Sequence, residues 1–373
     1  MKRLLNYKRI FLLLLTPISL LLIYLARMSS YFSEEIYARH IYKWISQLVS
    51  SITGLFPFSV AELLVILLPF VILILGIRFI LRMILDKENR REHLLKGILN
   101  VLCTASTLLF LFTIMAGINY YRNPFATYSN LEIRESSVEE LNALAHSLMV
   151  EANELRAQAT ATDEQGVFRL SVNDFTLAKL AREAYQLLAE DYPVLSGSYG
   201  APKPIFLSRL MSQTEITGIF FPFTMEANVN VDVPDYSIPV TMLHEQAHQR
   251  GFMREDEANF IAYLAGMKSD HVDLNYSSTM LALIIAGNAL YEQSPERYFE
   301  LRGGYSDDVV RDIRANSEYW QQYEDTVVST VSNKINDTYL KANAQTDGVK
   351  SYGRMLDLLL AIYRNENAEL EAK

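Results

Sequence analysis

Three long apolar runs in the first third of the chain constrain its fold more than any other feature. They cover about residues 10–26, 60–77 and 97–118. Each approaches the roughly 20 residues that a helix needs to cross a ~30 Å hydrocarbon core. Charged residues are almost absent inside the runs, and Glu62 lies at the edge of the second. We therefore expect three transmembrane helices. The first is expected to be a retained anchor, because no small-residue cleavage site follows it.

Lysine and arginine are distributed unevenly, and this predicts two domains and an orientation. Residues 1–118 hold 13 Lys and Arg against 6 Asp and Glu, whereas residues 119–373 hold 21 against 37. The basic residues of the first part gather before the first run and between the second and third. Because such loops are usually cytoplasmic, we expect a multi-pass protein of the cell membrane with a cytoplasmic N-terminus. The acidic second domain is then extracytoplasmic and disfavours nucleic acid, which requires a basic surface.

The stretch from Tyr31 to Leu55, between the first two runs, is amphipathic and aromatic. Two interpretations are open: it lies on the outer membrane surface, or it packs against the second domain. The single cysteine, Cys103, excludes both a disulfide within the chain and a cysteine-based zinc cluster.

The second domain is predicted to be mostly α-helical with a small sheet. Ser137 followed by Glu140 resembles a helix start. Helices are expected over about 136–158, 172–188, 238–250, 254–268, 276–292, 306–339 and 350–371, and strands within 204–208, 218–223 and 226–233. The strand 226–233 is one candidate for an edge strand that binds an extended peptide; a purely structural strand is the alternative.

The chemistry of the chain is concentrated in His244-Glu245-Gln-Ala-His248, an HExxH pattern. Residues four apart share one face of a helix, so His244 and His248 can each direct a ring nitrogen at a single cation. Glu245, next to the first histidine, is positioned to act on a water molecule at that cation rather than to bind it. Pro239 suits the first turn of such a helix and Gly251 suits the turn after it. The pattern predicts a Zn²⁺ site with His244 and His248 as ligands and Glu245 as the catalytic residue.

A third protein ligand is required, and two acids are candidates. Arg254 occupies the position where metzincins have a third histidine, which excludes that class. The segment Glu255-x-x-Ala258-Asn259 is similar to the ExxA[DN] motif of gluzincins. That resemblance implies Glu255 on the metal and Asn259 behind a histidine, on a gluzincin-like α+β domain. The spacing from His248 to Glu255 is short for those families, so Glu257 remains an alternative ligand.

The whole chain resembles an uncharacterised family of bacterial three-pass membrane proteins with an HExxHxxGxxxExEAN motif. The resemblance covers the apolar runs, Phe221–Asn228 and His244–Ala265. It implies no substrate.

Two functions are compatible with these residues. The first is a membrane-anchored zinc metalloendopeptidase that hydrolyses a protein or peptide substrate at the outer face of the membrane, with the lipid bilayer as a further partner. The second is a non-catalytic membrane protein with a structural or sensory zinc site. For the first, three residues are candidates to stabilise the oxyanion of the transition state: Tyr263, His271 and Tyr276.

Overall fold

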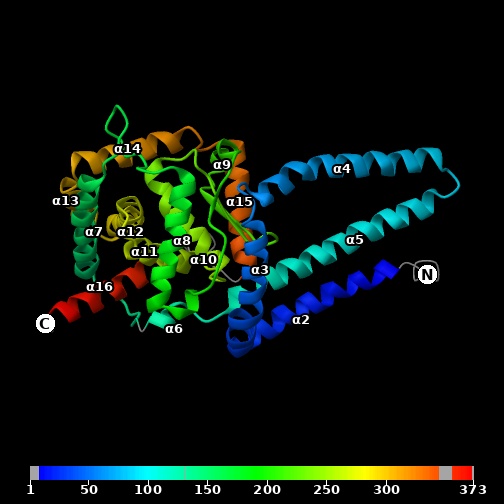
Figure 1. Cartoon of the computed structure of the whole chain (residues 1–373), viewed down its shortest axis with the longest axis horizontal. Coiled ribbons are helices and arrows are strands. Elements are labelled where there is room, and N and C mark those ends of the chain that lie inside the picture. Colours follow the sequence, from blue (N-terminus) through cyan, green and yellow to red (C-terminus); the bar gives the residue numbers. More distant parts are fainter. Residues whose placement is uncertain (1–7, 130, 344–354, 372–373) are drawn as a thin grey trace.

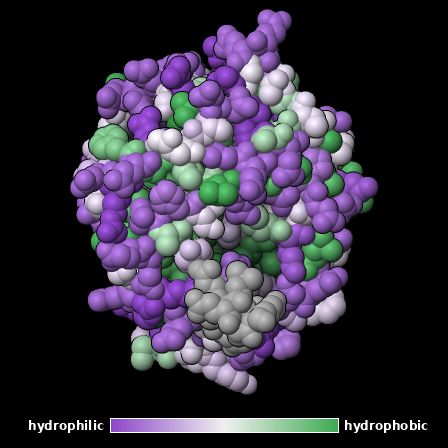
Figure 2. All heavy atoms as spheres, turned by 90° about the vertical axis from the view of Figure 1, so that its left-hand side faces the viewer, coloured by the Kyte–Doolittle hydropathy of each residue, from purple (hydrophilic) through white to green (hydrophobic). Residues whose placement is uncertain are grey.

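The computed structural model describes residues 8–129, 131–343 and 355–371. It confirms the predicted fold class: the chain is mostly helical, with three apolar N-terminal helices and one small sheet. Figure 1 shows the apolar helices extending to one side of a compact helical body. The opposite face of that body is covered mainly by hydrophilic side chains (Figure 2).

The three N-terminal helices are each long and apolar enough to cross a membrane. The first candidate span consists of a short 3₁₀ helix, η1 (Lys8–Leu14), that continues into α2 (Leu15–Met28). The other two are α4 (Val60–Leu85) and α5 (Arg90–Met115). Nearly all side chains of α4 are exposed in the structure, as a lipid-facing helix requires. The helices support a multi-pass membrane protein. They differ from the prediction in extent, since α4 and α5 include charged turns at their connection and α5 ends before residue 118.

The segment between the first two spans forms a π-helix, η2 (Phe32–Tyr42), that continues into α3 (Lys43–Thr53). Its inner face packs on the body, where Ser50 Oγ accepts hydrogen bonds from Gly200 N at 2.7 Å and from Gln249 Nε2 at 3.0 Å. Its outer face remains exposed: Trp44, Leu48 and Ile52 are 76%, 64% and 54% exposed. The segment therefore contacts the second domain and also presents an apolar stripe outward.

The body consists of helices packed around a shared core. They are α6 (Ala126–Ser129), α7 (Val138–Gln158), α8 (Asp174–Asp191), α9 (Ser208–Gln213), α10 (Ile238–Gln249), α11 (Glu255–Lys268), α12 (Val272–Gln293), α13 (Pro295–Gly303), α14 (Asp307–Gln321), α15 (Val327–Ala342) and α16 (Met355–Glu371), with 3₁₀ turns η3 (Gly117–Tyr121), η4 (Pro193–Leu195) and η5 (Asp235–Ser237). The Ser137 capping box opens α7 as predicted. Helix α10 lies at the centre, between the sheet and helices α8, α11 and α12.

Two predicted elements are different in the structure. The helix expected over 306–339 is two helices, α14 and α15. Asp325 adopts a left-handed φ of 55°, and the Thr326 side chain caps α15 by accepting from Ser329 N. The strand expected at 204–208 is shorter, since Ser208 already begins α9. Part of the helix expected over 350–371, residues 350–354, lies outside the described residues.

The sheet has three strands in the order β1-β3-β2. Strand β3 (Glu226–Val229) pairs in parallel with β1 (Lys203–Pro204) and antiparallel with β2 (Gly218–Phe221). The interpretation of 226–233 as the edge strand is therefore wrong, because β3 is central and every residue in it is buried. The two edge strands are β1 and β2.

Two carboxylates attach the start of α4 to the body. Glu226 accepts from Val60 N at 3.0 Å and Ala61 N at 2.7 Å, and it forms an ion pair with Lys203. Glu62, in the first turn of α4, accepts from the backbone of the loop before α9. Carboxylates suit the N-terminus of a helix, where unpaired N–H groups gather. The second membrane helix is thus fixed to the sheet.

Candidate metal centre

Helix α10 carries the HExxH residues, and its surroundings explain its position. Apolar side chains bury its other faces, including Met242, Leu243 and Ala247. The two histidines lie one turn apart on the remaining face, with ring centroids 4.6 Å apart. The predicted helix, about 238–250, agrees with the observed Ile238–Gln249.

A tight turn after α10 brings the third side chain back to the histidines. Gly251 adopts φ +87°, and a Cβ there would lie 2.9 Å from the Tyr42 ring. Only glycine suits both the left-handed backbone and this close approach. The chain then reverses into α11, whose first residue is Glu255.

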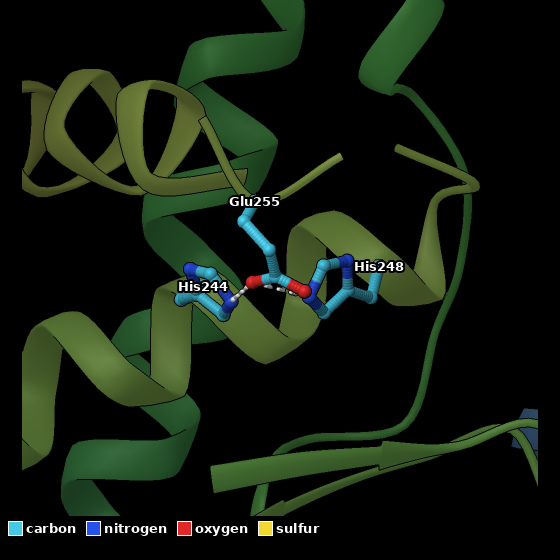
Figure 3. A group of neighbouring side chains, drawn as sticks. All are labelled: His244, His248 and Glu255. Carbon is cyan, nitrogen blue, oxygen red and sulfur yellow. Dashed lines mark ion pairs between the residues drawn. The ribbon is translucent and has the colours of Figure 1, made fainter. Parts of the chain in front are cut away.

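His244, His248 and Glu255, called here the metal group, meet in one place (Figure 3). Glu255 Oε2 lies 3.1 Å from His244 Nε2 and 3.7 Å from His248 Nε2. One ligand atom from each residue lies within 4.8 Å of the other two. The 3.1 and 3.7 Å separations suit ligands of a single cation, since two atoms bound to zinc at roughly 2.0–2.2 Å lie less than about 4.4 Å apart.

Hydrogen bonds behind the rings fix which nitrogen faces the centre. Asn259 Oδ1 lies 2.7 Å from His244 Nδ1, and the Phe252 carbonyl oxygen lies 2.7 Å from His248 Nδ1. Oxygens of this kind only accept, so each Nδ1 carries a hydrogen and each Nε2 is the nitrogen that faces Glu255. Histidines that bind metals are usually oriented in this way. Asn259 occupies the supporting position that the gluzincin resemblance implies.

The charges of the metal group are strongly coupled. Burial lowers the pKa of the His248 imidazole, but the Glu255 carboxylate outweighs burial and raises that pKa to about 9. Burial raises the pKa of Glu255, whereas His248 and His244 hold it well below its ordinary value. The three side chains thus form a compact site whose histidines and carboxylate suit a borderline divalent cation such as zinc.

Glu257, the alternative third ligand, is directed elsewhere. Its carboxylate forms an ion pair with Arg254 and accepts from Phe125 N at 2.6 Å. Glu257 is buried and serves to hold the segment before α6 against α11. The structure brings Glu255, and not Glu257, to the histidines.

Glu245 lies beside the metal group with a carboxylate oxygen that the protein leaves unsatisfied. Its side chain is buried, and among the described residues its Oε2 has no hydrogen-bond partner. Burial raises its pKa, against the opposing effect of the two histidines. Strand β2 packs on it so closely that a Cβ at Gly218 would lie 2.5 Å from Glu245 Oε1. A carboxylate in this state is suited to accept a proton.

The metal group and Glu245 open into a cleft of about 1120 Å³. Its walls come from α10, all four residues of β2, the C-terminal end of α5, and α15. Several side chains of the lining carry hydroxyl or amide groups: Tyr120, Thr217, Thr241, Asn259, Asn336 and Tyr339. The centre is therefore accessible to a ligand much larger than water.

The sequence pattern of a family of proteins of unknown function, DUF3810, matches residues 37–360. The chain belongs to this family. The match begins within η2 and covers the second and third candidate membrane helices and the metal group, so the family pattern includes all of these parts. No curated protein and no solved structure matches the chain.

Sequence reasoning missed two sets of residues around the site. Tyr42 donates from its hydroxyl to the carbonyls of His248 and Gln249, both at 3.2 Å, and so caps the end of α10. Tyr120 and Tyr339, whose hydroxyls are 2.8 Å apart, line the cleft. Both sets join segments far apart in the sequence, so no local pattern indicates them.

The three oxyanion candidates from the sequence do not line the cleft. Tyr276 donates to Asp312 at 2.7 Å in the core. Tyr263 packs on the main core, and His271 precedes α12 beside Asp273.

Proposed function

We propose that the chain is a membrane-anchored, zinc-dependent metallopeptidase with a gluzincin-like site. The observation that carries this proposal is the meeting of His244, His248 and Glu255, each histidine oriented by a hydrogen bond at Nδ1. Two histidines and one carboxylate form a donor set of catalytic zinc sites, which keep a further position for water or substrate. Zinc, when bound, supplies Lewis-acid chemistry: it polarises a carbonyl and lowers the pKa of water.

Side chains and backbone of the chain itself would transfer the proton, bind the substrate and stabilise the oxyanion. Glu245 would accept the proton of the attacking water and pass it to the leaving amine. Strand β2, at the edge of the sheet and in the cleft wall, would pair with an extended substrate backbone. Tyr339, hydrogen-bonded to Tyr120, is the hydroxyl that we assign to stabilising the developing oxyanion.

A structural or sensory zinc site is the second candidate. A structural site usually holds four protein ligands, whereas a catalytic site holds three. Among the described residues the metal group has three members, and it opens into the cleft. These two observations favour catalysis.

The metallopeptidase domain would lie outside the cytoplasm, with the N-terminus inside. The support is the Lys and Arg bias of the N-terminal segment and of the α4–α5 connection. A cysteine introduced at exposed Glu164 should react with a membrane-impermeant reagent in intact cells. Reaction only after cell lysis would contradict this orientation.

Activity is tested with the full chain in lipid bilayer discs, loaded with zinc and incubated with a diverse peptide library. We expect cleavage that a chelator abolishes, that zinc restores, and that Glu245→Gln removes. A zinc-loaded chain that cleaves no peptide, or cleaves equally as Glu245→Gln, would contradict the proposal.

A further inference from the structure

The lining of the cleft disfavours anionic ligands. Among the described residues that line it there is no lysine or arginine. Apart from the metal group and Glu245, its one charged member is Glu215. Phosphate and carboxylate groups are bound by cationic side chains. A ligand with an anionic head group, including a phospholipid, therefore finds no cationic side chain here beyond the histidines of the metal group.

One wall of the cleft is an apolar stripe on α15. Val327, Val331 and Ile335 follow one another at intervals of four residues, so they share a face of this helix. All three line the cleft, and they are 81%, 52% and 65% exposed. The residues that the structure describes therefore leave the space in front of this stripe open, which favours an apolar occupant.

Another part of the wall comes from the end of a candidate membrane helix. Phe112 and Ala116 line the cleft, and Phe112 belongs to the last turn of α5, one of the candidate spans. The Tyr339 ring contacts Phe112 edge-on, with centroids 6.2 Å apart, so α15 meets the end of α5. In Figure 1, α3 and α15 both run across the ends of the membrane helices. The cleft thus begins where α5 leaves the membrane.

The exposed apolar side chains of α3 indicate that the membrane surface lies near the end of α5. Trp44 and Leu48 point outward at this junction, whereas the far face of the body is mainly hydrophilic (Figure 2). A tryptophan at the boundary of a span is typical of the membrane interface. Together these features set the cleft against the membrane surface.

We propose that the cleft takes an extended, uncharged, apolar peptide segment that directly follows a transmembrane helix of another protein. The absence of cationic lining argues against a phospholipid, and the β2 edge offers backbone pairing that only a peptide can use. The apolar stripe of α15 then selects the side chains next to the cleaved bond. This inference rests on the proposed peptidase function and adds its substrate class.

The test uses the full zinc-loaded chain reconstituted in liposomes with three single-span reporter proteins. The first carries an apolar segment directly after its span. The second carries the same segment behind a flexible spacer of about 40 residues, which holds it roughly 35 Å away. The third has the segment, directly after the span, replaced by serine, glutamine and lysine. We expect the first reporter to be cleaved faster than both of the others. The expected factor over the third is at least about tenfold, the scale of discrimination that an apolar pocket provides.

Two variants of α15 test the role of the stripe. Val331→Asn/Ile335→Asn changes the face in the cleft, and Lys334→Asn/Thr338→Asn changes exposed residues of the same helix that do not line it. The first should reduce the preference for the apolar reporter several-fold, and the second should leave it unchanged. Equal effects of the two variants would overturn the role of the stripe.

The outcomes distinguish failure of this substrate class from failure of the proposed peptidase function. Cleavage of library peptides together with equal rates on the three reporters would overturn the inference and leave the peptidase function intact. No cleavage of any peptide or reporter would overturn both. Release of a lipid fragment from the liposomes, with every reporter intact, would identify a lipid occupant and likewise reject the peptide.

Discussion

Buried carboxylates in two regions of this molecule have opposite surroundings. At the junction of the membrane helices with the body, Glu226 is satisfied by Lys203 and two backbone N–H groups. Glu34, also at the junction, is satisfied by Arg122, which donates to both of its oxygens at 2.9 and 3.0 Å. In both cases the protein supplies the positive charge.

Glu255 and Glu245, in the cleft, have different surroundings. Glu255 faces two histidines that are themselves ligand candidates, and Glu245 Oε2 has no partner among the described residues. A buried carboxylate oxygen without a hydrogen-bond partner, such as Glu245 Oε2, costs free energy. The difference separates acids that hold the fold together from acids that are arranged for a cation and a reaction.

The largest expected effect is the loss of turnover when Glu245 is changed. Glu245→Gln removes the proton acceptor but no member of the metal group. We expect peptidase activity to fall by about 10²–10⁴-fold, the usual contribution of a general base. Zinc content and thermal midpoint should remain within error of the wild type. Loss of zinc in this variant would mean that Glu245 is a ligand.

The matching change at the junction should affect stability instead. Glu226→Gln leaves the buried Lys203 ammonium without its carboxylate, and breaking such a pair costs about 3–5 kcal/mol. The thermal midpoint of the full chain in bilayer discs should fall clearly, while zinc per folded chain stays constant. An unchanged midpoint would place Glu226 with the acids of the cleft and break the comparison.

The two glutamates at the start of α11 sharpen the comparison within a single helix turn. Glu255→Gln should weaken zinc binding by at least about tenfold, because it removes a charged ligand. Glu257→Gln should leave zinc affinity almost unchanged and lower stability, because Arg254 loses its partner. Competition with a zinc-binding dye measures both. The reverse pattern would assign the third ligand to Glu257.

A smaller effect is expected from the strand beside Glu245. Gly218→Ala introduces a methyl group 2.5 Å from Glu245 Oε1, so the carboxylate or β2 must move. Misplacing a catalytic group by about 1 Å can cost up to about 10²-fold, and we expect a loss near tenfold in kcat with unchanged zinc. Wild-type activity in this variant would show that Glu245 does not act from its observed position.

Local sequence patterns predicted much of this structure. The apolar runs predicted the three membrane helices, Ser137 and Glu140 predicted the start of α7, and the HExxH spacing predicted a helix with both histidines on one face. Each of these signals depends on residues within one or two helical turns. The motif resemblance likewise brought Asn259 into the site through residues close in sequence.

Most of the wrong or missing predictions have the same physical cause. The contact of Tyr42 with the end of α10, the pair Tyr120 and Tyr339, and the central place of β3 all depend on which distant segments pack together. The break between α14 and α15 is different, because Asp325 and Thr326 form a local stop and cap that the apolar periodicity concealed. The cleft depends on tertiary contacts and could not be predicted from local patterns, whereas the acids and histidines that face it could.

The central claim is that His244, His248 and Glu255 bind one zinc ion. The direct measurement is the zinc content, by mass spectrometry, of the purified full chain, of His244→Ala/His248→Ala, and of His40→Ala/His146→Ala, a control pair of exposed histidines. We predict about one zinc per chain for the wild type and the control, and almost none for the first variant. Full zinc in His244→Ala/His248→Ala would contradict the account.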